Sequence, residues 1–326
     1  MKILTSAEIQ RLLTVSEAID LIRKLFAEMG GGGVELQLRT SIALHGGKDT
    51  VLFMPGHVAG MNNLGVKIVG IFPNNPVNHN RSTISATILL NDLQTGEVMA
   101  VLDGAYITAV RTGAVSAVAT DLLAIKHAHR LGVIGAGVQA RSHIDAIRQV
   151  RAITDVRIFD VDAARTQAFV DALRRDHPTG CRFQAVTSAA DAVVEADVVV
   201  TATTSSTPVF PGSLLKPGVH VNAIGAFQPG HRELDDDLMK RSRIFVDSRA
   251  EALAEAGDLI IPLGTGVIGL AAIEASLADL VVGRHDGRRD DAEVTVFKAV
   301  GLAVEDIVVA SYVFEKSSAF SVGTVV

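Results

Sequence analysis

The sequence predicts an α/β fold in which a doubly wound parallel sheet accompanies a second, mainly antiparallel α+β domain. Three features of the chain support this prediction. From Leu131 onward, short apolar runs alternate with helical stretches, as they do in repeated strand–helix units. A glycine-rich turn directly follows the first of these runs. Before residue 104, strand-like runs instead follow one another closely, which is typical of antiparallel strands joined by tight turns.

The composition is that of a globular protein. The 326 residues are enough for two domains of about 100–200 residues each. A net charge of −6, with no long run of basic residues, argues against a nucleic-acid partner. No apolar run approaches the ~20 residues of a membrane span and the first residues have no signal-peptide pattern, so a cytoplasmic protein is expected. Cys181 is the single cysteine, and no Cys/His cluster has metal-ligand spacing, so neither a disulfide nor a metal is expected.

Two helices are predicted at the start of the chain. Thr5-x-x-Glu8 and Thr14-x-x-Glu17 both have the spacing of a capping box, in which two side chains satisfy backbone N–H groups at a helix start. The four glycines at 30–33 are expected to end the second helix, because glycine loses more conformational entropy in a helix than other residues do.

Strands and one long helix complete the first part of the chain. Residues 36–44 alternate between apolar and polar, which predicts one half-buried strand. The turn-forming residues 91–96 predict a hairpin between the last two strands of this part. A helix rich in small residues is predicted over 104–123. Further strands are predicted near residues 50–54, 64–72, 83–90 and 97–102.

The second part of the chain is predicted to form the parallel sheet. Helical stretches separate its early strands, and a strand near 293–297 and a helix from about 301 to 315 close the chain. The other predicted strands lie at 131–135, 156–159, 182–186, 197–201, 220–224 and 244–246.

The most informative motif is the glycine-rich turn. Gly135-x-Gly137-x-x-Ala140 lies between an apolar strand and a helix, which is the context of the dinucleotide-binding fingerprint of Rossmann folds. Gly135 allows the tight turn, Gly137 lets the backbone approach a pyrophosphate, and the small Ala140 allows close packing of helix and strand. Because a helix N-terminus also favours phosphate charge, the motif predicts a bound dinucleotide.

An acidic residue indicates which dinucleotide the motif would bind. Asp160 ends the next predicted strand, near the distance of about 20 residues that the fingerprint requires. Its carboxylate would accept hydrogen bonds from the adenosine ribose and repel a 2′-phosphate, so NAD is favoured over NADP. The alternative is that Asp160 only caps a helix that begins near Asp162.

Three isolated basic residues interrupt apolar or small-residue patterns in the first part of the chain. They are Arg39, Lys67 and Arg111. Each taken alone is most simply a solvated surface charge. Three of them in one part of a dinucleotide-binding protein favour a site for a substrate carboxylate, for which arginine has the better geometry.

Seven segments, spread over nearly the whole chain, form a family pattern. They are Met54-Pro55-Gly56, Gly65-Val66-Lys67, Arg111-Thr112-Gly113-Ala114, Gly135 to Ala140, His220 to Ala226, Glu233-Leu234-Asp235 and Thr295 to Lys298. With these segments the chain resembles the ornithine cyclodeaminase/mu-crystallin family.

The resemblance implies a division of the chain and a role for each matching residue. Residues 1–118 and 302–326 would form a substrate-binding and dimerisation domain, and residues 119–301 a NAD-binding Rossmann domain, in a homodimer. Arg39, Lys67 and Arg111 would hold the substrate carboxylate, and Val300 would line the substrate pocket. Besides the two fingerprint glycines, the cofactor-side residues would be Thr83, Arg111, Thr112, Val138, Gln139, Asp160, Thr201, Ala223, Ile224, Gly225, Ala226 and His231.

Two departures from the family pattern indicate the branch. True ornithine cyclodeaminases have an acidic residue for the substrate's side-chain amine, and Leu52 matches its position here. They also have a catalytic Asp, where this chain has Phe227. Since neither side chain binds an ammonium group, the chain resembles the ketimine or pyrroline-2-carboxylate reductase branch more closely. The expected substrates are Δ1-pyrroline-2-carboxylate and Δ1-piperideine-2-carboxylate, reduced to proline and pipecolate.

The expected chemistry is hydride transfer between the nicotinamide and an imine carbon next to a carboxylate. Two roles are open for Lys67. Burial near two arginines should depress the pKa of its ammonium group, which suits a proton donor near neutral pH. Alternatively, Lys67 only holds the carboxylate and water supplies the proton.

Three other functions are alternatives. A lyase of the ornithine cyclodeaminase type would release ammonia without net consumption of NADH. An amino-acid dehydrogenase like alanine dehydrogenase would use the same hydride chemistry on a keto acid and ammonia. A non-catalytic binding protein of the mu-crystallin type would need only the cofactor fingerprint, and the basic residues Arg39, Lys67 and Arg111 argue against it.

Overall fold

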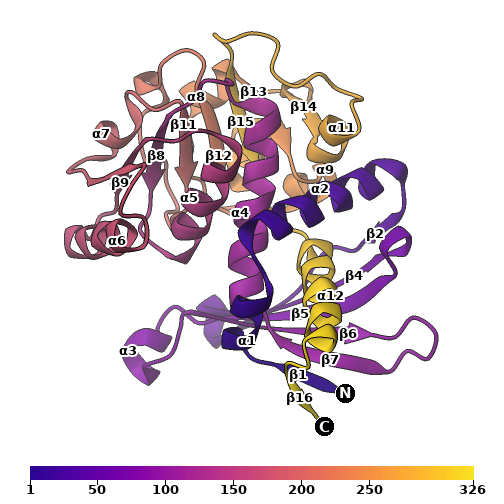
Figure 1. Ribbon diagram of the computed structural model, residues 1–326. Coiled ribbons are helices and arrows are strands. Elements are labelled where there is room, and N and C mark those ends of the chain that lie inside the picture. The colour runs from indigo at the N-terminus through magenta and orange to yellow at the C-terminus, as the bar shows by residue number, and fades with distance from the viewer. The chain divides into compact units, whose positions relative to one another are not determined.

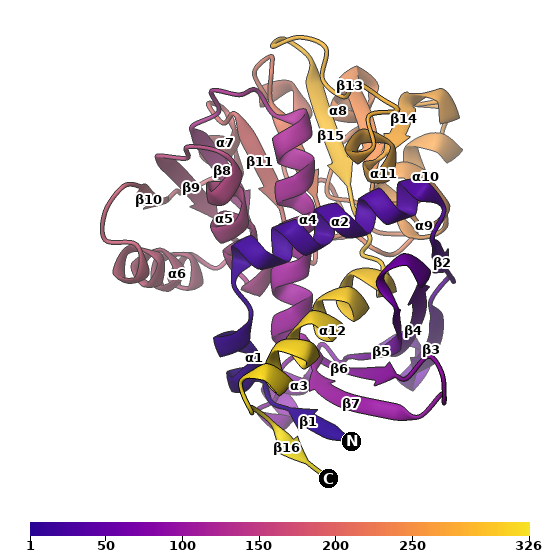
Figure 2. The ribbon, with the colours of Figure 1, turned by 45° about the vertical axis from the view of Figure 1, so that its right-hand side comes forward.

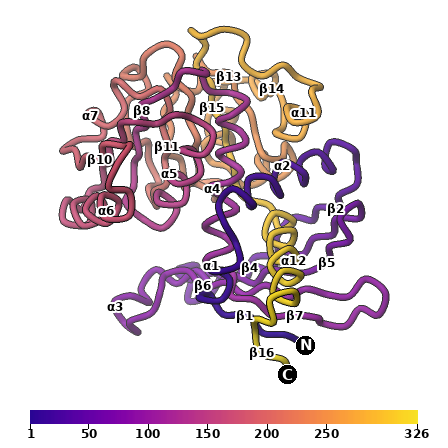
Figure 3. Tube along the Cα trace, in the orientation of Figure 1, coloured from indigo at the N-terminus to yellow at the C-terminus, as the bar shows by residue number.

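The computed structural model describes residues 1–326, which form two compact units. The terminal unit contains residues 1–111 and 301–326, and the central unit contains residues 112–300. Within the terminal unit the two ends of the chain lie side by side, because the first and the last strand pair with each other (Figure 3). The predicted division at 118/119 and 301/302, into a substrate-binding and dimerisation domain and a NAD-binding domain, stays a prediction.

The terminal unit is built on an eight-stranded sheet (Figure 1). Its strand order is β16-β1-β7-β6-β5-β4-β2, and β3 also pairs with β4. All of these pairs are antiparallel except that of β1 with β7, so the predicted mainly antiparallel sheet is confirmed. The strands are β1 (Lys2–Leu4), β2 (Val34–Leu36), β3 (Thr40–Leu44), β4 (Asp49–Val58), β5 (Asn63–Ile71), β6 (Ile84–Asn91), β7 (Val98–Asp103) and β16 (Thr324–Val325).

Helices cover one face of this sheet. Helix α12 (Ala303–Ala319) packs on β4, β5 and β6, and α1 (Ser6–Leu12) and α2 (Val15–Gly31) pack on α12 (Figure 2). Both predicted capping boxes form, since Glu8 and Glu17 each accept a backbone N–H at 2.9 Å. A short helix, α3 (Asn75–His79), lies between β5 and β6.

The single strand predicted over residues 36–44 is wrong. The chain forms two separate strands, β2 and β3, which both pair with β4 but at different stretches of it. Between them Leu38 is 57% exposed, and most of β3 is exposed as well. The alternating pattern therefore reflects an edge of the sheet rather than a half-buried strand.

The central unit is a Rossmann fold with eight parallel strands (Figure 1). Its order is β10-β9-β8-β11-β12-β15-β13-β14, and the first five positions follow the 3-2-1-4-5 order of doubly wound dinucleotide-binding sheets, while the last strand of the unit, β15, takes the sixth position. The expected fold class is thus confirmed, although β14 was not predicted. The strands are β8 (Arg130–Ile134), β9 (Asp155–Phe159), β10 (Arg182–Ala185), β11 (Val198–Thr201), β12 (His220–Ala223), β13 (Ser242–Val246), β14 (Ile273–Ser276) and β15 (Val294–Lys298).

Helices connect these strands, and one helix spans the division of the chain. Helix α4 runs from Gly104 to Leu123 as predicted, and the boundary between the units falls after Arg111 within it. No helix of the protein combines the length and the apolar character that crossing a bilayer requires. The other helices are α5 (Val138–Val150), α6 (Ala163–Asp176), α7 (Ala189–Val193), α8 (Asp236–Arg241), α9 (Arg249–Glu255), α10 (Gly257–Gly264) and α11 (Leu277–Val281).

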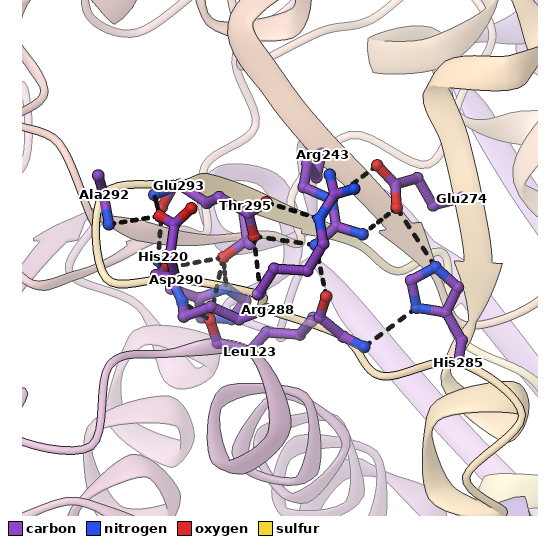
Figure 4. Close-up of polar contacts among 12 residues, drawn as sticks. Leu123, His220, Arg243, Glu274, His285, Arg288, Asp290, Ala292, Glu293 and Thr295 are labelled. Atoms are coloured by element: carbon purple, nitrogen blue, oxygen red, sulfur yellow. Dashed lines mark hydrogen bonds and ion pairs between the residues drawn. The ribbon is translucent and has the colours of Figure 1, made fainter.

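A polar network ties together the amino ends of the parallel strands (Figure 4). Arg243 on β13 donates to Glu274 on β14 and to Glu293 just before β15, at 2.7 and 2.9 Å. His220 at the start of β12 contacts the Thr295 hydroxyl at 2.9 Å, and burial lowers the pKa of His220 to about 3. This imidazole is therefore neutral, and the network braces the sheet edge opposite the one at which Rossmann folds bind ligands.

Candidate functional site

Lys67 is a buried cation on the face of the terminal sheet that packs against α12. On β5 it lies opposite Met54 of β4 and Ile88 of β6, so its stem is in apolar surroundings. The side chain is 2% exposed, and its ammonium group forms an ion pair with Asp306. Burial lowers the pKa of Lys67 to about 8, Arg111 and Arg39 act in the same direction, and Asp306 opposes them. The predicted depression of this pKa is confirmed.

Arg111 is the second buried cation of the terminal unit. Its Nε donates to Asp306 Oδ1 at 3.1 Å, and its Nη1 forms an ion pair with Glu305. Burial disfavours the charge on Arg111, but Asp306 and Glu305 together raise its pKa above the ordinary value. Arg111 is therefore a permanent cation at this place.

Arg39 joins the same group through the residue that precedes α12 by two positions. Its Nη2 donates to the carbonyl oxygen of Gly301 at 2.8 Å. Gly301 has a φ of +80°, which favours glycine, and a Cβ there would lie 2.7 Å from Arg111 Nη1 and displace this guanidinium. The terminal unit thus brings the three predicted basic residues together around the first turn of α12.

Sequence reasoning missed the two carboxylates of this site. Glu305 and Asp306 are fully buried, and Asp306 also accepts from the Thr108 hydroxyl at 3.0 Å. Acidic residues are common in the first turn of a helix because the helix dipole favours them. For this reason, the sequence pattern did not distinguish Glu305 and Asp306 from ordinary helix-start residues. The available signal was the apolar run 307–310 that follows, because it predicts a fully buried helix start, where carboxylates need cationic partners.

These five residues are called the cation cluster: Arg39, Lys67, Arg111, Glu305 and Asp306. Three cations and two carboxylates leave one net positive charge when Lys67 is protonated. Arg39 is half-buried and the other four side chains are buried, and cations withdrawn from water favour a nearby counter-ion. The cation cluster therefore suits one carboxylate of a ligand.

The remaining predicted substrate residues are divided between the two units. In the terminal unit, Leu52 is buried two positions from Met54 on β4 and so faces the same side of the sheet as Lys67. In the central unit, Phe227 is half-buried against the apolar core. The backbone N–H of Val300 donates to Asp247 there at 2.7 Å. The roles of these residues in substrate binding stay predictions.

The fingerprint turn in the central unit has the form that a pyrophosphate requires. Gly135 has a φ of +106°, and a Cβ there would lie 2.6 Å from the carbonyl oxygen of Ala202. Nothing lies within 4 Å of the place of a Cβ on Gly137, which is the uncapped N-cap of α5. Val138 in the first turn is 71% exposed and Gln139 is half-buried. The open backbone at this helix start fits a dinucleotide phosphate.

Asp160 lies directly beside the fingerprint turn. Its Oδ2 accepts the Ala136 N–H at 2.9 Å, and its Oδ1 accepts the Asp162 N–H at 3.0 Å. The cap of α6 is Asp162, which accepts the N–H of Arg165 at 3.0 Å, so the alternative of Asp160 as this cap is wrong. The carboxylate at the end of β9 fits the position that contacts an adenosine ribose in this fold.

Most of the other predicted cofactor-side residues gather at the carboxyl ends of β11 and β12. The Ile224 N–H donates to the carbonyl of Thr201 at 2.9 Å, and Ala223 and Ala226 on either side of the Ile224-Gly225 pair are buried. His231 is half-buried in the loop that follows, and its N–H donates to Gln228. Thr112 is buried on α4 in this unit, whereas Thr83 lies in the terminal unit before β6, its carbonyl accepting the Phe72 N–H at 2.8 Å.

Residues 1–320 match the model of the ornithine cyclodeaminase/mu-crystallin family. The chain is 37% identical over 324 residues to a Δ1-pyrroline-2-carboxylate reductase of Bacillus cereus, a match that covers 99% of this chain and 98% of the relative. The resemblance seen in the sequence is thereby confirmed.

Two solved structures are similar over nearly the whole chain. The Thermococcus litoralis Δ1-pyrroline-2-carboxylate reductase in complex with NADH and L-proline has a TM-score of 0.97 and 36% identity, and the match covers 100% of both chains. An archaeal alanine dehydrogenase dimer with bound NAD has a TM-score of 0.93 and 32% identity, with 99% of this chain and 98% of that chain covered.

Proposed function

This chain belongs to the ornithine cyclodeaminase/mu-crystallin family, and on that premise we propose that it is a NADH-dependent reductase of small cyclic ketimine carboxylates. The substrates are Δ1-pyrroline-2-carboxylate and Δ1-piperideine-2-carboxylate, and the products are proline and pipecolate. The observation that carries the proposal is the cation cluster, which gathers two arginines and a buried lysine of depressed pKa around the first turn of α12.

The charge of the cluster selects the acid group. Arg39 and Arg111 hold the substrate carboxylate, and one carboxylate neutralises the one excess charge. A dicarboxylate would leave a buried negative charge without a partner in this cluster. A monocarboxylate is therefore the better ligand.

Lys67 supplies the proton. With a pKa of about 8, its ammonium group is mostly protonated at pH 7 and still acidic enough to donate to an imine nitrogen. NADH, when bound, supplies the hydride that the imine carbon accepts. Asp306 keeps the ammonium group in place through its ion pair, while its other oxygen fixes Arg111. After the reaction the product nitrogen carries the proton, and solvent restores it to Lys67.

Two apolar residues limit the size and charge of the substrate. Leu52 and Phe227 offer no partner for a second amino group, so ornithine would bring an unpaired ammonium group into an apolar place. This favours a ketimine reductase over a cyclising lyase. It also agrees with the activity named for the Bacillus cereus relative.

We also propose that the protein works as a homodimer in the cytoplasm, where NADH is available. Side chains on the sheet face that points away from α12 are apolar but only half-buried in the single chain. A second copy packed on this face would bury them. The similar alanine dehydrogenase is itself a dimer. These side chains are Val51, Phe53, Pro55, Leu64, Val66 and Ile68.

A substrate screen tests the function. Purified protein is mixed with NADH and either Δ1-pyrroline-2-carboxylate, Δ1-piperideine-2-carboxylate, pyruvate plus ammonia, or ornithine with NAD⁺. Loss of nicotinamide absorbance should be fastest with a cyclic ketimine, and its product should be the L-amino acid.

The other arms identify the alternatives. Faster oxidation of NADH with pyruvate and ammonia would indicate an alanine dehydrogenase. Release of ammonia from ornithine without net change in NADH would indicate a lyase. Tight binding of NADH without turnover of any substrate would indicate a binding protein, and each of these results would overturn the proposal.

A further inference from the structure

A second group of buried charges lies in the central unit, and the proposed mechanism does not use it. We call Glu233, Asp258 and Lys298 the carboxyl-edge triad. All three side chains are 0% exposed. Burying three ionisable groups is costly unless each is paired or hydrogen-bonded, so their contacts indicate what they do.

Glu233 connects the ends of two neighbouring parallel strands. Its Oε2 accepts from the Thr201 hydroxyl at 2.8 Å and from the Gly225 N–H at 2.7 Å. Its Oε1 accepts from the N–H and the hydroxyl of Thr203 at 2.8 and 2.7 Å. Thr201 ends β11, and Gly225 follows the end of β12, so one carboxylate holds both strand ends.

Asp258 fixes the backbone at Glu233, and Lys298 pairs with Asp258. Asp258 Oδ1 accepts the N–H groups of Glu233 and Leu234 at 2.7 and 2.9 Å. Its Oδ2 lies 3.0 Å from the Nζ of Lys298, the last residue of β15, and neither of these two atoms has a well-directed hydrogen bond. The ion pair thus serves electrostatics rather than hydrogen bonding, and it extends the triad to a third strand end.

The two loops held by Glu233 lie close to each other. A Cβ at Gly225 would overlap the carbonyl oxygen of Thr203 and would lie 2.6 Å from Glu233 Oε1. Burial raises the pKa of Glu233 above its ordinary value and the Asp258 carboxylate adds to the rise, while Lys298 and the donors on Thr203 act in the opposite direction. Because the two backbone N–H groups can only donate, this environment suits the ionised carboxylate.

The position of the triad in the sheet indicates which part of the cofactor depends on it. A doubly wound sheet consists of two mononucleotide-binding halves that meet at the switch point, here between β8 and β11. The half that begins at β8 contains the fingerprint and Asp160 and therefore takes the adenosine. The other half contains β11, β12 and β15, and so takes the nicotinamide. The triad connects the carboxyl ends of these three strands.

We propose that Glu233, supported by Asp258 and Lys298, is the positioning residue for the nicotinamide half of the cofactor. It acts through the backbone of residues 201–203 and 223–225 and touches neither substrate nor the reacting atoms. The inference rests on the proposed use of NADH. The inference goes beyond that proposal because it separates the residues that position the nicotinamide from those that bind the adenosine.

The test compares NADH with ADP-ribose, which has the adenosine and pyrophosphate but no nicotinamide. Dissociation constants are measured by fluorescence and calorimetry for the full chain and for Glu233→Gln. In this nearly isosteric variant the new amide N–H faces donors. The variant should bind NADH about tenfold more weakly and ADP-ribose within twofold of the unaltered protein.

A milder pair of variants keeps the test decisive should Glu233→Gln not fold. Thr203→Val removes one of the four donors to Glu233 and should weaken the binding of NADH about threefold, again without effect on the binding of ADP-ribose. Thr207→Val in the same loop, whose side chain is exposed, is the matched control and should change neither constant.

Equal weakening of NADH and ADP-ribose would show a general structural role, and unchanged NADH binding would show no role. Either result would overturn the inference. A protein that binds ADP-ribose but not NADH before any substitution would instead contradict the proposed function.

Discussion

The two buried charge groups of this protein, one in each unit, differ in net charge and in what surrounds their charged atoms. The cation cluster has one excess positive charge among three cations and two carboxylates. The carboxyl-edge triad has one excess negative charge, and backbone and hydroxyl donors occupy both oxygens of Glu233. Donors of the protein itself surround the carboxylate of Glu233, which therefore holds loops in place, whereas the gathered cations of the cation cluster favour the carboxylate of a ligand.

The largest effect is expected for Lys67→Met. The kcat for imine reduction should fall about 10³-fold, because a positioned proton donor contributes roughly 10²–10⁴-fold. Steady-state kinetics with NADH and Δ1-pyrroline-2-carboxylate at pH 7 measure it. Lys48→Met, at an exposed position, should retain full activity. A raised KM with unchanged kcat would mean that Lys67 only holds the carboxylate.

Asp306→Asn tests whether the carboxylates are needed to bury the cations. Removing one partner from a buried ion pair should lower the free energy of unfolding by about 3–5 kcal/mol. Urea denaturation followed by circular dichroism measures this change. Glu315→Gln on the exposed side of the same helix should alter it by no more than about 0.5 kcal/mol. A loss below about 1 kcal/mol for Asp306→Asn would show that the pair is solvated.

The pH dependence follows from the pKa of Lys67, which is about 8. Reduction needs the protonated amine, so kcat should be constant below this pH and fall about tenfold per unit above it. Oxidation of proline needs Lys67 as a neutral amine, so the kcat for this reverse reaction should rise through the same pH. Because Asp306 raises the pKa of Lys67, Asp306→Asn should move both transitions to lower pH. A flat profile up to pH 10 would exclude Lys67 as the acid.

A smaller change is expected in cofactor preference. Asp160→Ala removes the acceptor beside the fingerprint turn and the charge that repels a 2′-phosphate. The ratio of kcat/KM for NADH to that for NADPH should fall about tenfold. Asp171→Ala, at a half-exposed position of α6 where the carboxylate accepts only from Gln167 and Arg174, should leave the ratio unchanged. If the ratio stays the same in Asp160→Ala, another residue selects the cofactor.

The smallest effect is expected for a charge that water partly screens. Glu17 accepts from Tyr312 and Lys316 at 2.6 Å and closes a capping box, and despite partial burial these hydrogen bonds lower its pKa to about 2. Glu17→Gln should cost about 1 kcal/mol of stability at pH 7. Since the pKa of Glu17 is lowered on folding, this contribution should disappear as the pH falls from about 4.5 to about 2. Urea denaturation at pH 7 and pH 2.5 measures both, and a loss as large as that of Asp306→Asn would contradict the role of burial.

The sequence by itself determined the features that depend on near neighbours. The capping boxes at Thr5 and Thr14, the turn at Gly135 and the order of strand–helix units all follow from residues a few positions apart. Local backbone sterics and hydrogen bonds decide such features, and they operate before the chain is compact. The three basic residues were also visible, because they interrupt apolar patterns.

Only the tertiary structure decided which charges are buried together. Lys67 and Asp306 are 239 positions apart, and no periodicity connects them. The strand pair β1–β16 and the division of residues 36–44 into β2 and β3 likewise depend on pairing between distant segments. The physical reason is that a carboxylate at a helix start looks the same in sequence whether water or a lysine compensates it. Folding alone determines which of the two surrounds Asp306.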